Sequence, residues 1–193
     1  MQYYNENAVE YAEKTLPISM TEQYEKFLRT LPQNGFILDA GCGSGRDALY
    51  FLKNGYKVDA FDGSDEMARL AGQLTGLNVK CLRFQEYTPR PIYDGIWANA
   101  SLLHVPHEEL HDVLTAFRKS LKPCGTLYCS FKYGKEDSVD AHGRCFTNKT
   151  CEALDKDLAA AGFTARRSIA LQKSTTPEGA PQDWVGALAI APD

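Results

Sequence analysis

The chain has 193 residues, of which 44% are apolar and 24% are charged, and its formal net charge is −4 at pH 7. This length suits one domain whose core needs neither disulfides nor a metal ion. The acidic balance argues against a large nucleic-acid interface, which requires clustered Lys and Arg side chains. No stretch reaches the roughly 18 apolar residues of a membrane span, and the N-terminal segment has no apolar run of the signal-peptide kind. We therefore expect a cytoplasmic protein, monomeric or homodimeric, with neither a nucleic acid nor a membrane as its partner.

The cysteines give no sign of a disulfide framework or a zinc site. They are irregularly spaced and form no C-x-x-C pair, whereas disulfide-rich scaffolds are short secreted chains and zinc sites show close pairs. We predict six free thiols in a reducing compartment, at Cys42, Cys81, Cys124, Cys129, Cys145 and Cys151.

Apolar patterns of helical and strand type alternate along the chain. Two helices are predicted first, over Glu6–Lys14 and Thr21–Leu31. Strands are then predicted over Phe36–Gly41, Tyr56–Asp62, Asn78–Phe84, Tyr93–Ala100 and Thr126–Lys132. The helices predicted among them cover Arg46–Asn54, a segment that begins after Ser64, a segment between Pro106 and Pro123, and Lys149–Ala161. Two last strands, near Thr164–Lys173 and Trp184–Ala191, flank the turn-rich stretch Thr175–Gln182 and predict an antiparallel hairpin.

Strand–helix units in series predict right-handed crossovers and a parallel sheet covered on both faces. The fold class is therefore α/β, with one domain over residues 1–193 and the N-terminal helices, residues 1–31, as a possible lid. Ligands of such sheets bind beyond the carboxyl ends of the strands, where the strand order reverses. The loops that follow the strands are thus the places to look for a site.

A glycine-rich loop, Asp39-Ala-Gly-Cys-Gly-Ser-Gly45, joins the first strand directly to a helix. Glycines let the backbone turn sharply and let a ligand approach closely. The dinucleotide fingerprint G-x-G-x-x-G would need a third glycine at position 46, which is Arg46 here, and the phosphate-binding sequence G-x-x-x-x-G-K-[ST] is absent. This spacing disfavours a nicotinamide oxidoreductase.

The run I-L-D-A-G-C-G-S-G-R-D, from Ile37 to Asp47, resembles motif I of the class I S-adenosylmethionine-dependent methyltransferases. Asp62 ends the second strand 21 residues after Gly41, where that family has an acid that holds both ribose hydroxyls. The sequence L-K-P-C-G resembles the family element L-K-P-G-G and departs from it at Cys124. The resemblance implies a Rossmann-like three-layer sandwich around a mostly parallel seven-stranded sheet that ends in an antiparallel hairpin.

The resemblance also implies the cofactor, S-adenosyl-L-methionine, and its contacts. The glycine loop would line the methionine part, Gly63, Ser64 and Met67 would edge the adenosine, and the end of the fourth strand would run beside the sulfonium. Gln85 and Glu86 are alternative partners for the adenine amino group. The residues expected at the cofactor are Asp39, Gly41, Cys42, Gly43, Gly45, Arg46, Asp62, Gly63, Ser64, Met67, Phe84, Gln85, Asn99 and Ala100.

Residues 36–62 are most similar to small stand-alone methyltransferases of the tellurite-resistance type, which implies methyl transfer to a small-molecule acceptor. His104, just beyond the fourth strand, is a candidate general base, and a structural histidine is the alternative interpretation. The long loop Lys132–Asn148 could contact the acceptor or be a solvated loop. Its candidate contacts are Lys132, Tyr133, Glu136, Arg144 and Phe146, and Tyr3, Tyr4 and Tyr11 could fold over the pocket or simply pack.

Four alternatives remain at this stage. His107-Glu-Glu-Leu-His111 matches the H-E-x-x-H zinc motif, but it begins an amphipathic surface helix without a third ligand, so we predict no metal. The second alternative is a nucleic-acid or protein methyltransferase, which uses the same cofactor and a different acceptor. The third is a cofactor-binding module without turnover, and the fourth is a nicotinamide oxidoreductase.

Overall fold

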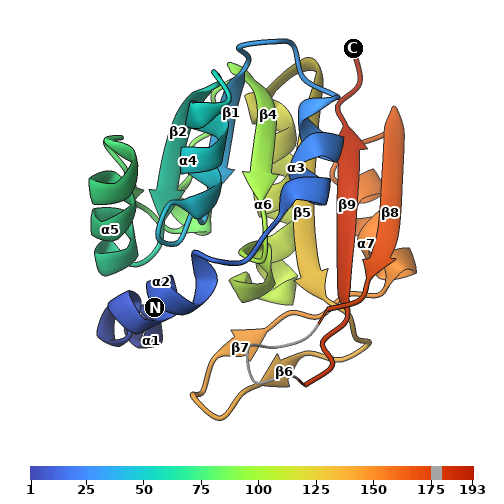
Figure 1. Ribbon diagram of the computed structural model, residues 1–193. Helices are drawn as coiled ribbons and strands as arrows, with labels where there is room; N and C mark the ends of the chain where they lie inside the picture. The colour runs from blue at the N-terminus through green and yellow to red at the C-terminus, as the bar shows by residue number, and fades with distance from the viewer. Residues whose placement is uncertain (175–179) are drawn as a thin grey trace.

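The computed structural model describes residues 1–174 and 180–193, and a seven-stranded sheet with the order β3-β2-β1-β4-β5-β9-β8 lies at its centre (Figure 1). The strands are β1 (Phe36–Ala40), β2 (Lys57–Asp62), β3 (Lys80–Cys81), β4 (Tyr93–Ala98), β5 (Leu121–Lys132), β8 (Arg166–Gln172) and β9 (Trp184–Ile190). The first five pair in parallel, and β9 is antiparallel to both β5 and β8. The predicted sheet and its closing hairpin are confirmed.

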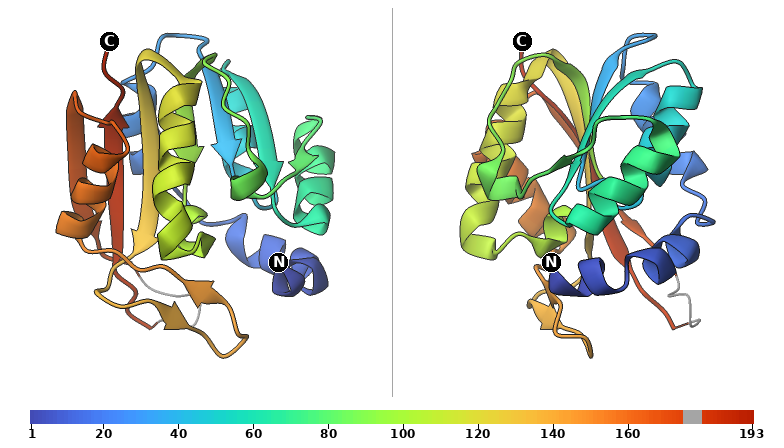
Figure 2. Two further views of the ribbon diagram at one scale, coloured as in Figure 1. Left: turned by 180° about the vertical axis from the view of Figure 1, so that it is seen from behind. Right: turned by 90° about the vertical axis from the view of Figure 1, so that its left-hand side faces the viewer.

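Helices cover both faces of this sheet (Figures 1 and 2). On one face lie α3 (Thr21–Leu28) and α4 (Arg46–Lys53), and on the other lie α6 (His107–Ser120) and α7 (Cys151–Ala160). The helix α5 (Asp65–Thr75) packs beside α4 at the β2 edge. Two separate apolar cores correspond to the two faces, one around Phe27, Phe51 and Trp97 and the other around Leu114 and Phe117. The three-layer α/β sandwich is therefore as predicted.

The strand order reverses at β1, which pairs with β2 on one side and with β4 on the other. All five parallel strands present their carboxyl ends at one edge of the sheet. At that edge lie α1 (Gln2–Glu6), α2 (Ala8–Thr15) and a small hairpin of β6 (Ser138–Val139) and β7 (Cys145–Phe146) (Figure 1). Two short 3₁₀ turns, η1 (Phe84–Glu86) and η2 (Leu102–His104), follow β3 and β4. The fold thus brings the loops that follow the parallel strands, the N-terminal helices and the β6–β7 hairpin together at one edge of the sheet.

The predicted third strand, Asn78–Phe84, is mostly wrong, because only Lys80 and Cys81 pair with β2. The chain turns inward after Cys81, where the Phe84 ring packs edge-on against Phe61, with 5.5 Å between the ring centroids. Burial of an aromatic side chain outweighs the two or three ladder hydrogen bonds that a longer edge strand would gain.

The fifth strand begins at Leu121 rather than Thr126. Leu121 pairs with Tyr93, and the register then shifts so that Thr126 faces Gly95. The residues between form a bulge in which Cys124 has a positive φ of 58°, the conformation that the glycine of L-K-P-G-G would adopt more easily.

Helix ends are mostly within one to three residues of the predicted positions. Ser64 caps α5 as predicted, since its Oγ accepts a hydrogen bond from the Met67 N–H at 3.2 Å. Thr150 caps α7 in the same way, so this helix begins two residues later than predicted. The first predicted helix, Glu6–Lys14, corresponds to α2, and the short helix α1 before it was not predicted. The hairpin β6–β7 falls in the predicted loop, and residues 175–179 of the predicted turn lie outside the described residues.

Within the described ranges, no helix has both the length and the apolar character needed to cross a membrane.

Candidate active site

Three glycines of the loop between β1 and α4 have left-handed backbone conformations. Gly41, Gly43 and Gly45 have φ values of 73°, 54° and 89°. A Cβ atom at Gly41 would lie 2.5 Å from the Ser101 Cβ, and one at Gly45 would lie 3.0 Å from Ala71, so both positions need glycine for packing. At Gly43 no atom lies within 4 Å of such a Cβ. The loop therefore presents bare backbone to open space at Gly43.

Asp62, at the end of β2, faces this loop. Its Oδ2 accepts a hydrogen bond from the Gly43 N–H at 2.8 Å, and its Oδ1 accepts one from the Ser64 N–H at 2.9 Å. Burial raises the pKa of this carboxyl group, although the same backbone donors act to lower it. A largely desolvated carboxylate thus stands across from exposed backbone, and it can accept further hydrogen bonds.

A cavity of about 60 Å³ joins the glycine loop, Asp62 and the N-terminal helices. Seven of the predicted cofactor residues line it, namely Gly41, Gly43, Asp62, Gly63, Met67, Phe84 and Ala100. The predicted Tyr11 and His104 also line it, and so do Met1, Tyr4 and Ser101. Met1 and Ser101 are residues that the motif did not indicate. The side chain of Met1 lies against Gly63, where an added Cβ would be 2.6 Å from the Met1 Cε.

The other predicted cofactor residues do not line this cavity. Asn99 bonds to Asp47 and Ser130, and Ser64 caps α5. Gln85 is exposed, and its Nε2 donates to Glu109 at 2.5 Å. Glu86 accepts from the Arg83 N–H and closes the 3₁₀ turn. The two alternatives for the adenine amino group are therefore both engaged with protein atoms.

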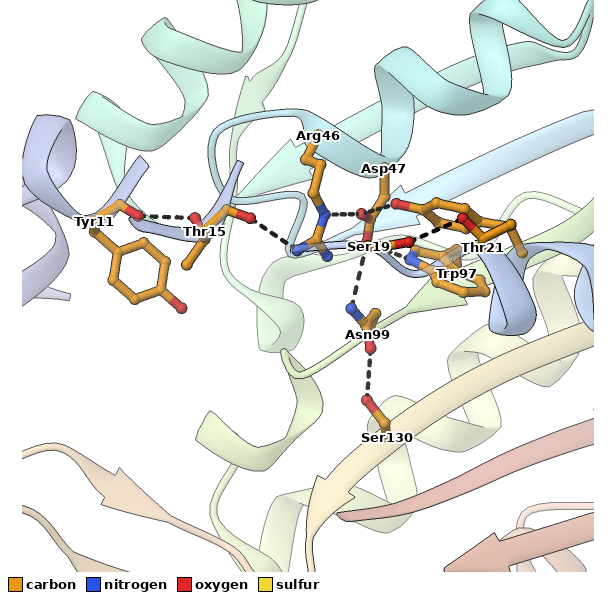
Figure 3. Close-up of polar contacts among 10 residues, drawn as sticks. Tyr11, Thr15, Ser19, Thr21, Arg46, Asp47, Trp97, Asn99 and Ser130 are labelled. Atoms are coloured by element: carbon orange, nitrogen blue, oxygen red, sulfur yellow. Dashed lines mark hydrogen bonds and ion pairs between the residues drawn. The ribbon is translucent and has the colours of Figure 1, made fainter. Parts of the chain in front are cut away.

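A buried polar cluster lies beneath the glycine loop (Figure 3). Asp47 accepts hydrogen bonds from the Tyr24 hydroxyl at 2.5 Å, from the Trp97 Nε1–H at 2.6 Å and from the Arg46 Nε–H at 2.5 Å. Arg46 also donates from Nη1 to the Thr15 carbonyl at 3.1 Å, at the end of α2. The cluster links β1's loop, α3, β4 and the N-terminal segment, and motif I did not single out Asp47 as its centre.

Asp39, at the end of β1, is 2% exposed. Its Oδ2 has no hydrogen-bond partner among the described residues. Burial and the nearby Asp47 carboxylate raise the pKa of Asp39 well above its usual value. A buried acceptor without a donor is costly, so this oxygen suits a ligand that brings a donor.

His104 lies in η2, and its hydrogen bonds define which nitrogen is basic. Nδ1 is 3.2 Å from the Cys145 carbonyl oxygen, which can only accept, so Nδ1 carries the proton. Nε2 therefore accepts from the Tyr4 hydroxyl, 2.7 Å away. Burial, together with the positive charges of Arg144 and Lys132, lowers the pKa of His104 to about 4, although the hydrogen bond to the Cys145 carbonyl acts to raise it. The imidazole is neutral near pH 7, with a lone pair directed at Tyr4.

The predicted acceptor contacts are partly brought together. The Lys132 Nζ lies 3.3 Å from the centroid of the Phe146 ring, and the Phe146 and His104 rings are 5.1 Å apart. The Arg144 Cζ lies 4.3 Å from the Tyr3 centroid and 5.7 Å from the Tyr4 centroid.

Tyr4 also packs edge-on against Tyr11, with 5.2 Å between their centroids. Tyr133, at 44% exposed, and Glu136 instead point to solvent away from this group.

The H-E-x-x-H motif does not form a metal centre. The His107 Nδ1 bonds to the buried Lys149 Nζ at 3.0 Å, and His111 is exposed on α6. Among residues 1–174 and 180–193, no group of three or more His, Cys, Asp or Glu side chains could hold a metal ion. All six cysteines are free thiols.

The groups at this edge fit S-adenosylmethionine in chemical terms. The two ribose hydroxyls suit the Asp62 carboxylate, and the amino group of the methionine part suits the unpartnered Asp39 oxygen. The unbranched methionine side chain suits the open backbone at Gly43. A ligand of that size requires about 300 Å³ or more, which exceeds the present volume of the cavity beside the Met1 side chain.

Comparison with known proteins agrees with this geometry. A family model described as a methyltransferase domain matches residues 11–167. An uncharacterized methyltransferase of Staphylococcus carnosus is 28% identical over 149 residues, which are 73% of this chain and 70% of that protein. N-terminal Xaa-Pro-Lys N-methyltransferase 1-A of Xenopus laevis is 31% identical over 114 residues, 55% of this chain and 51% of that protein, so the match spans about half of each.

Among solved structures, 1,6-didemethyltoxoflavin-N1-methyltransferase of Burkholderia thailandensis shares the fold with a TM-score of 0.77 at 23% identity, over 100% of this chain and 85% of that one. It was solved with 1,6-didemethyltoxoflavin and S-adenosylhomocysteine bound. The family match covers well over half of the sequence, and the sheet order and glycine loop agree with it. The chain therefore belongs to the methyltransferase domain family, and it is a class I methyltransferase whose cofactor is S-adenosylmethionine.

Proposed function

We propose that this protein transfers the methyl group of S-adenosylmethionine to a small-molecule acceptor in the cytoplasm, as a monomer or a homodimer. The observation that carries the cofactor part is the Asp62 carboxylate held against the Gly43 backbone at 2.8 Å. The acidic net charge of −4 favours a small acceptor over a nucleic acid. The sequence resemblance to tellurite-resistance enzymes is a prediction in the same direction.

In the proposed binding mode, Asp62 holds the ribose diol, and Gly63, Met67 and Phe84 enclose the adenosine. The free oxygen of Asp39 accepts from the amino group of the methionine part, which runs over Gly43. Asn99, Gln85 and Ser64 act only through the residues that they position, because their polar groups are engaged elsewhere. Arg46 has the same indirect role through Asp47.

When bound, the cofactor supplies a methyl carbon that is activated by the adjacent sulfonium. The residues of the chain align the acceptor with it and exclude water. The neutral Nε2 of His104 is the proposed acceptor of the proton that a hydroxyl, thiol or protonated amine gives up as it becomes the nucleophile. Tyr4 hydrogen-bonds to this nitrogen, so the acceptor must displace the Tyr4 hydroxyl or pass its proton through it.

We further propose that residues 1–193 act as a single domain in which the N-terminal helices, residues 1–31, form a lid. Met1, Tyr4 and Tyr11 line the cavity, while α3 is packed firmly into the core through Tyr24 and Phe27. The moving part is therefore α1 and α2, with α3 as its fixed base.

Calorimetry tests the cofactor assignment. The protein should bind S-adenosylmethionine and S-adenosylhomocysteine but not NADH. Asp62→Asn should weaken the affinity for S-adenosylhomocysteine at least tenfold, because it removes a charge-assisted acceptor. Asp65→Asn, which changes an exposed acid three residues away, should leave this affinity unchanged. Equal affinity in the two variants would contradict the assignment.

A screen that follows release of S-adenosylhomocysteine tests the acceptor class. It should contain selenite, tellurite, thiols, phenols and amines, together with an Xaa-Pro-Lys peptide of the kind named for the Xenopus relative. Turnover only with the peptide would replace the small-molecule proposal by protein methylation. Binding without turnover on any acceptor would favour a cofactor-binding module.

A further inference from the structure

Two cations stacked on aromatic rings border the acceptor side of the cavity. Lys132, the last residue of β5, holds its Nζ 3.3 Å from the Phe146 centroid, and the Arg144 Cζ is 5.5 Å from the same centroid. The Phe146 ring also lies beside the His104 ring, with 5.1 Å between the ring centroids. Both cations therefore share one buried ring with the proposed proton acceptor.

The charges at this place do not balance. Arg144 is paired with Asp140, whose Oδ2 lies 2.6 Å from its Nη2. Lys132 forms no ion pair with any carboxylate of residues 1–174 and 180–193, and its ammonium group rests only on the Phe146 ring. Two cations and one carboxylate leave one positive charge. Burial, and then the charge of Arg144, lower the pKa of Lys132, which shows that the site disfavours an isolated ammonium.

An anion is the partner that this arrangement lacks. A half-buried ammonium without a carboxylate gains from a charge-assisted hydrogen bond, which is stronger and shorter than a neutral one. The Phe146 ring is buried beneath Lys132, whereas the partly exposed rings of Tyr3 and Tyr4 offer flat apolar surfaces nearby. The carboxylate that lines the cavity, Asp62, lies at the glycine loop.

Resting on the proposed methyltransferase function, we propose that the acceptor is a small organic anion whose carboxylate or phosphate group is bound by Lys132. Its apolar body lies along Tyr3 and Tyr4, and its nucleophilic atom faces Nε2 of His104. Arg144 adds a second, partly neutralised positive charge. Lys132 is thus a specificity-determining residue, and it takes no part in the proton transfer.

This charge pattern separates two kinds of acceptor. Amines and basic peptides are cations near pH 7, and each would bring a like charge within about 10 Å of Lys132 and Arg144, a distance at which such charges still repel. An anion is attracted by the same two residues.

Titration of matched probes tests the proposal. Protein saturated with S-adenosylhomocysteine is titrated with 4-hydroxybenzoate and its neutral counterpart 4-hydroxybenzamide, and with phenyl phosphate and its counterpart phenol. At least one anion should bind about tenfold or more tightly than its neutral partner, and the difference should shrink as the salt concentration rises. The two pairs distinguish a carboxylate site from a phosphate site.

Three variants identify the residue responsible. Lys132→Met keeps most of the side-chain length and should remove the preference for the anion, whereas Lys132→Arg should keep it. Lys57→Met removes one charge from an exposed lysine at the amino end of β2, on the opposite edge of the sheet, and should change nothing. Thermal unfolding of each variant establishes that the protein is folded.

Several outcomes would overturn the inference. These are equal affinity for the anion and its neutral partner, no binding of any anion by the wild-type protein, or an anion preference that survives in Lys132→Met. Tight binding of an Xaa-Pro-Lys peptide instead would assign the surface to a basic peptide. The titrations are also repeated without S-adenosylhomocysteine, so that the two proposals are tested separately. Failure of the protein to bind S-adenosylhomocysteine would contradict the methyltransferase function. Loss of the anion preference alone would contradict only the proposal about the acceptor.

Discussion

Asp47 is the centre of the buried polar cluster beneath the glycine loop. It accepts from the Tyr24 hydroxyl, the Trp97 indole and the Arg46 guanidinium, and it is only 7% exposed. Asp47→Ala would leave the Arg46 charge buried without its partner, so we expect the free energy of unfolding to fall by about 3 kcal/mol. Urea denaturation measures this change. Asp112→Ala, at an exposed position of α6, should cost less than about 0.5 kcal/mol, and a similar cost for both variants would contradict the cluster.

Asp39 links stability to pH. Its pKa is raised in the folded state by burial and by Asp47, so the unfolded chain releases this proton first as the pH rises. The folded state therefore loses stability from about pH 4 upward, the unfolded pKa of an aspartate. Asp39→Asn removes this loss. We expect urea denaturation to show a gain in stability over wild type that is larger at pH 7 than at pH 4, together with weaker binding of S-adenosylhomocysteine. A gain that is independent of pH would contradict the buried carboxyl assignment.

The activity should report the depressed pKa of His104. Burial lowers this pKa to about 4, so Nε2 stays unprotonated above that pH, and protonation becomes significant only as the pH falls toward it. If His104 is the base, kcat/KM should be flat between about pH 6 and pH 8 and decline only as the pH approaches 4. An acidic limb near the ordinary histidine pKa of about 6.5 would contradict this environment.

A substitution separates the catalytic role of His104 from a structural one. His104→Ala should lower kcat about 100-fold or more while the affinity for S-adenosylhomocysteine stays within about twofold. His111→Ala, on the exposed side of α6, should keep full activity. Full activity in the His104 variant would return this histidine to a packing role.

The N-terminal helices α1 and α2 bury few residues. α1 has no buried residue, and α2 buries only Ala8 and Ala12, whereas α6 buries five residues. Few buried contacts mean low local stability, so hydrogen exchange should be fast in α1 and α2 and slow in α6. Binding of S-adenosylhomocysteine must displace Met1 from Gly63, and it should change the exchange of α1 more than that of α6. Protection of α1 equal to that of α6 in the free protein would exclude the lid.

The elements also show where sequence patterns were sufficient. The alternation of apolar strands and amphipathic helices predicted the sheet, because each pattern reports burial along a regular element. The third strand failed because the strand pattern continues through Leu82 and Phe84, while the packing of Phe84 on Phe61 turns the chain out of the ladder. The sequence patterns missed the hairpin β6–β7 for another reason. Its two-residue strands depend on the Asp140–Arg144 ion pair, and no periodic pattern announces such a contact.

The candidate site was predictable where it depends on backbone. Gly41, Gly43 and Asp62 follow from motif I and its spacing, and they meet around one cavity. Met1 and Ser101 were missed because they reach the cavity by tertiary packing alone. The outward position of Gln85 depends on its bond to Glu109, 24 residues away, which a local sequence reading does not detect.

For the whole molecule, the H-E-x-x-H motif makes metal content a decisive measurement. His107 is bonded to Lys149, and the described residues contain no cluster of three metal-ligating side chains. We expect elemental analysis to find no stoichiometric zinc, and methyl transfer to proceed unchanged in the presence of a chelator. Loss of activity on chelation, restored by zinc, would contradict the structure.

The shared carboxylate of Asp47 has a consequence for laboratory evolution of the protein. This side chain contacts residues beneath the glycine loop, at the base of the N-terminal helices and in one apolar core. A substitution at position 47 therefore changes acceptor binding and thermal stability together. Libraries that leave position 47 and its four donors fixed, and diversify the rim around Lys132 and Phe146, should keep a far larger share of folded clones.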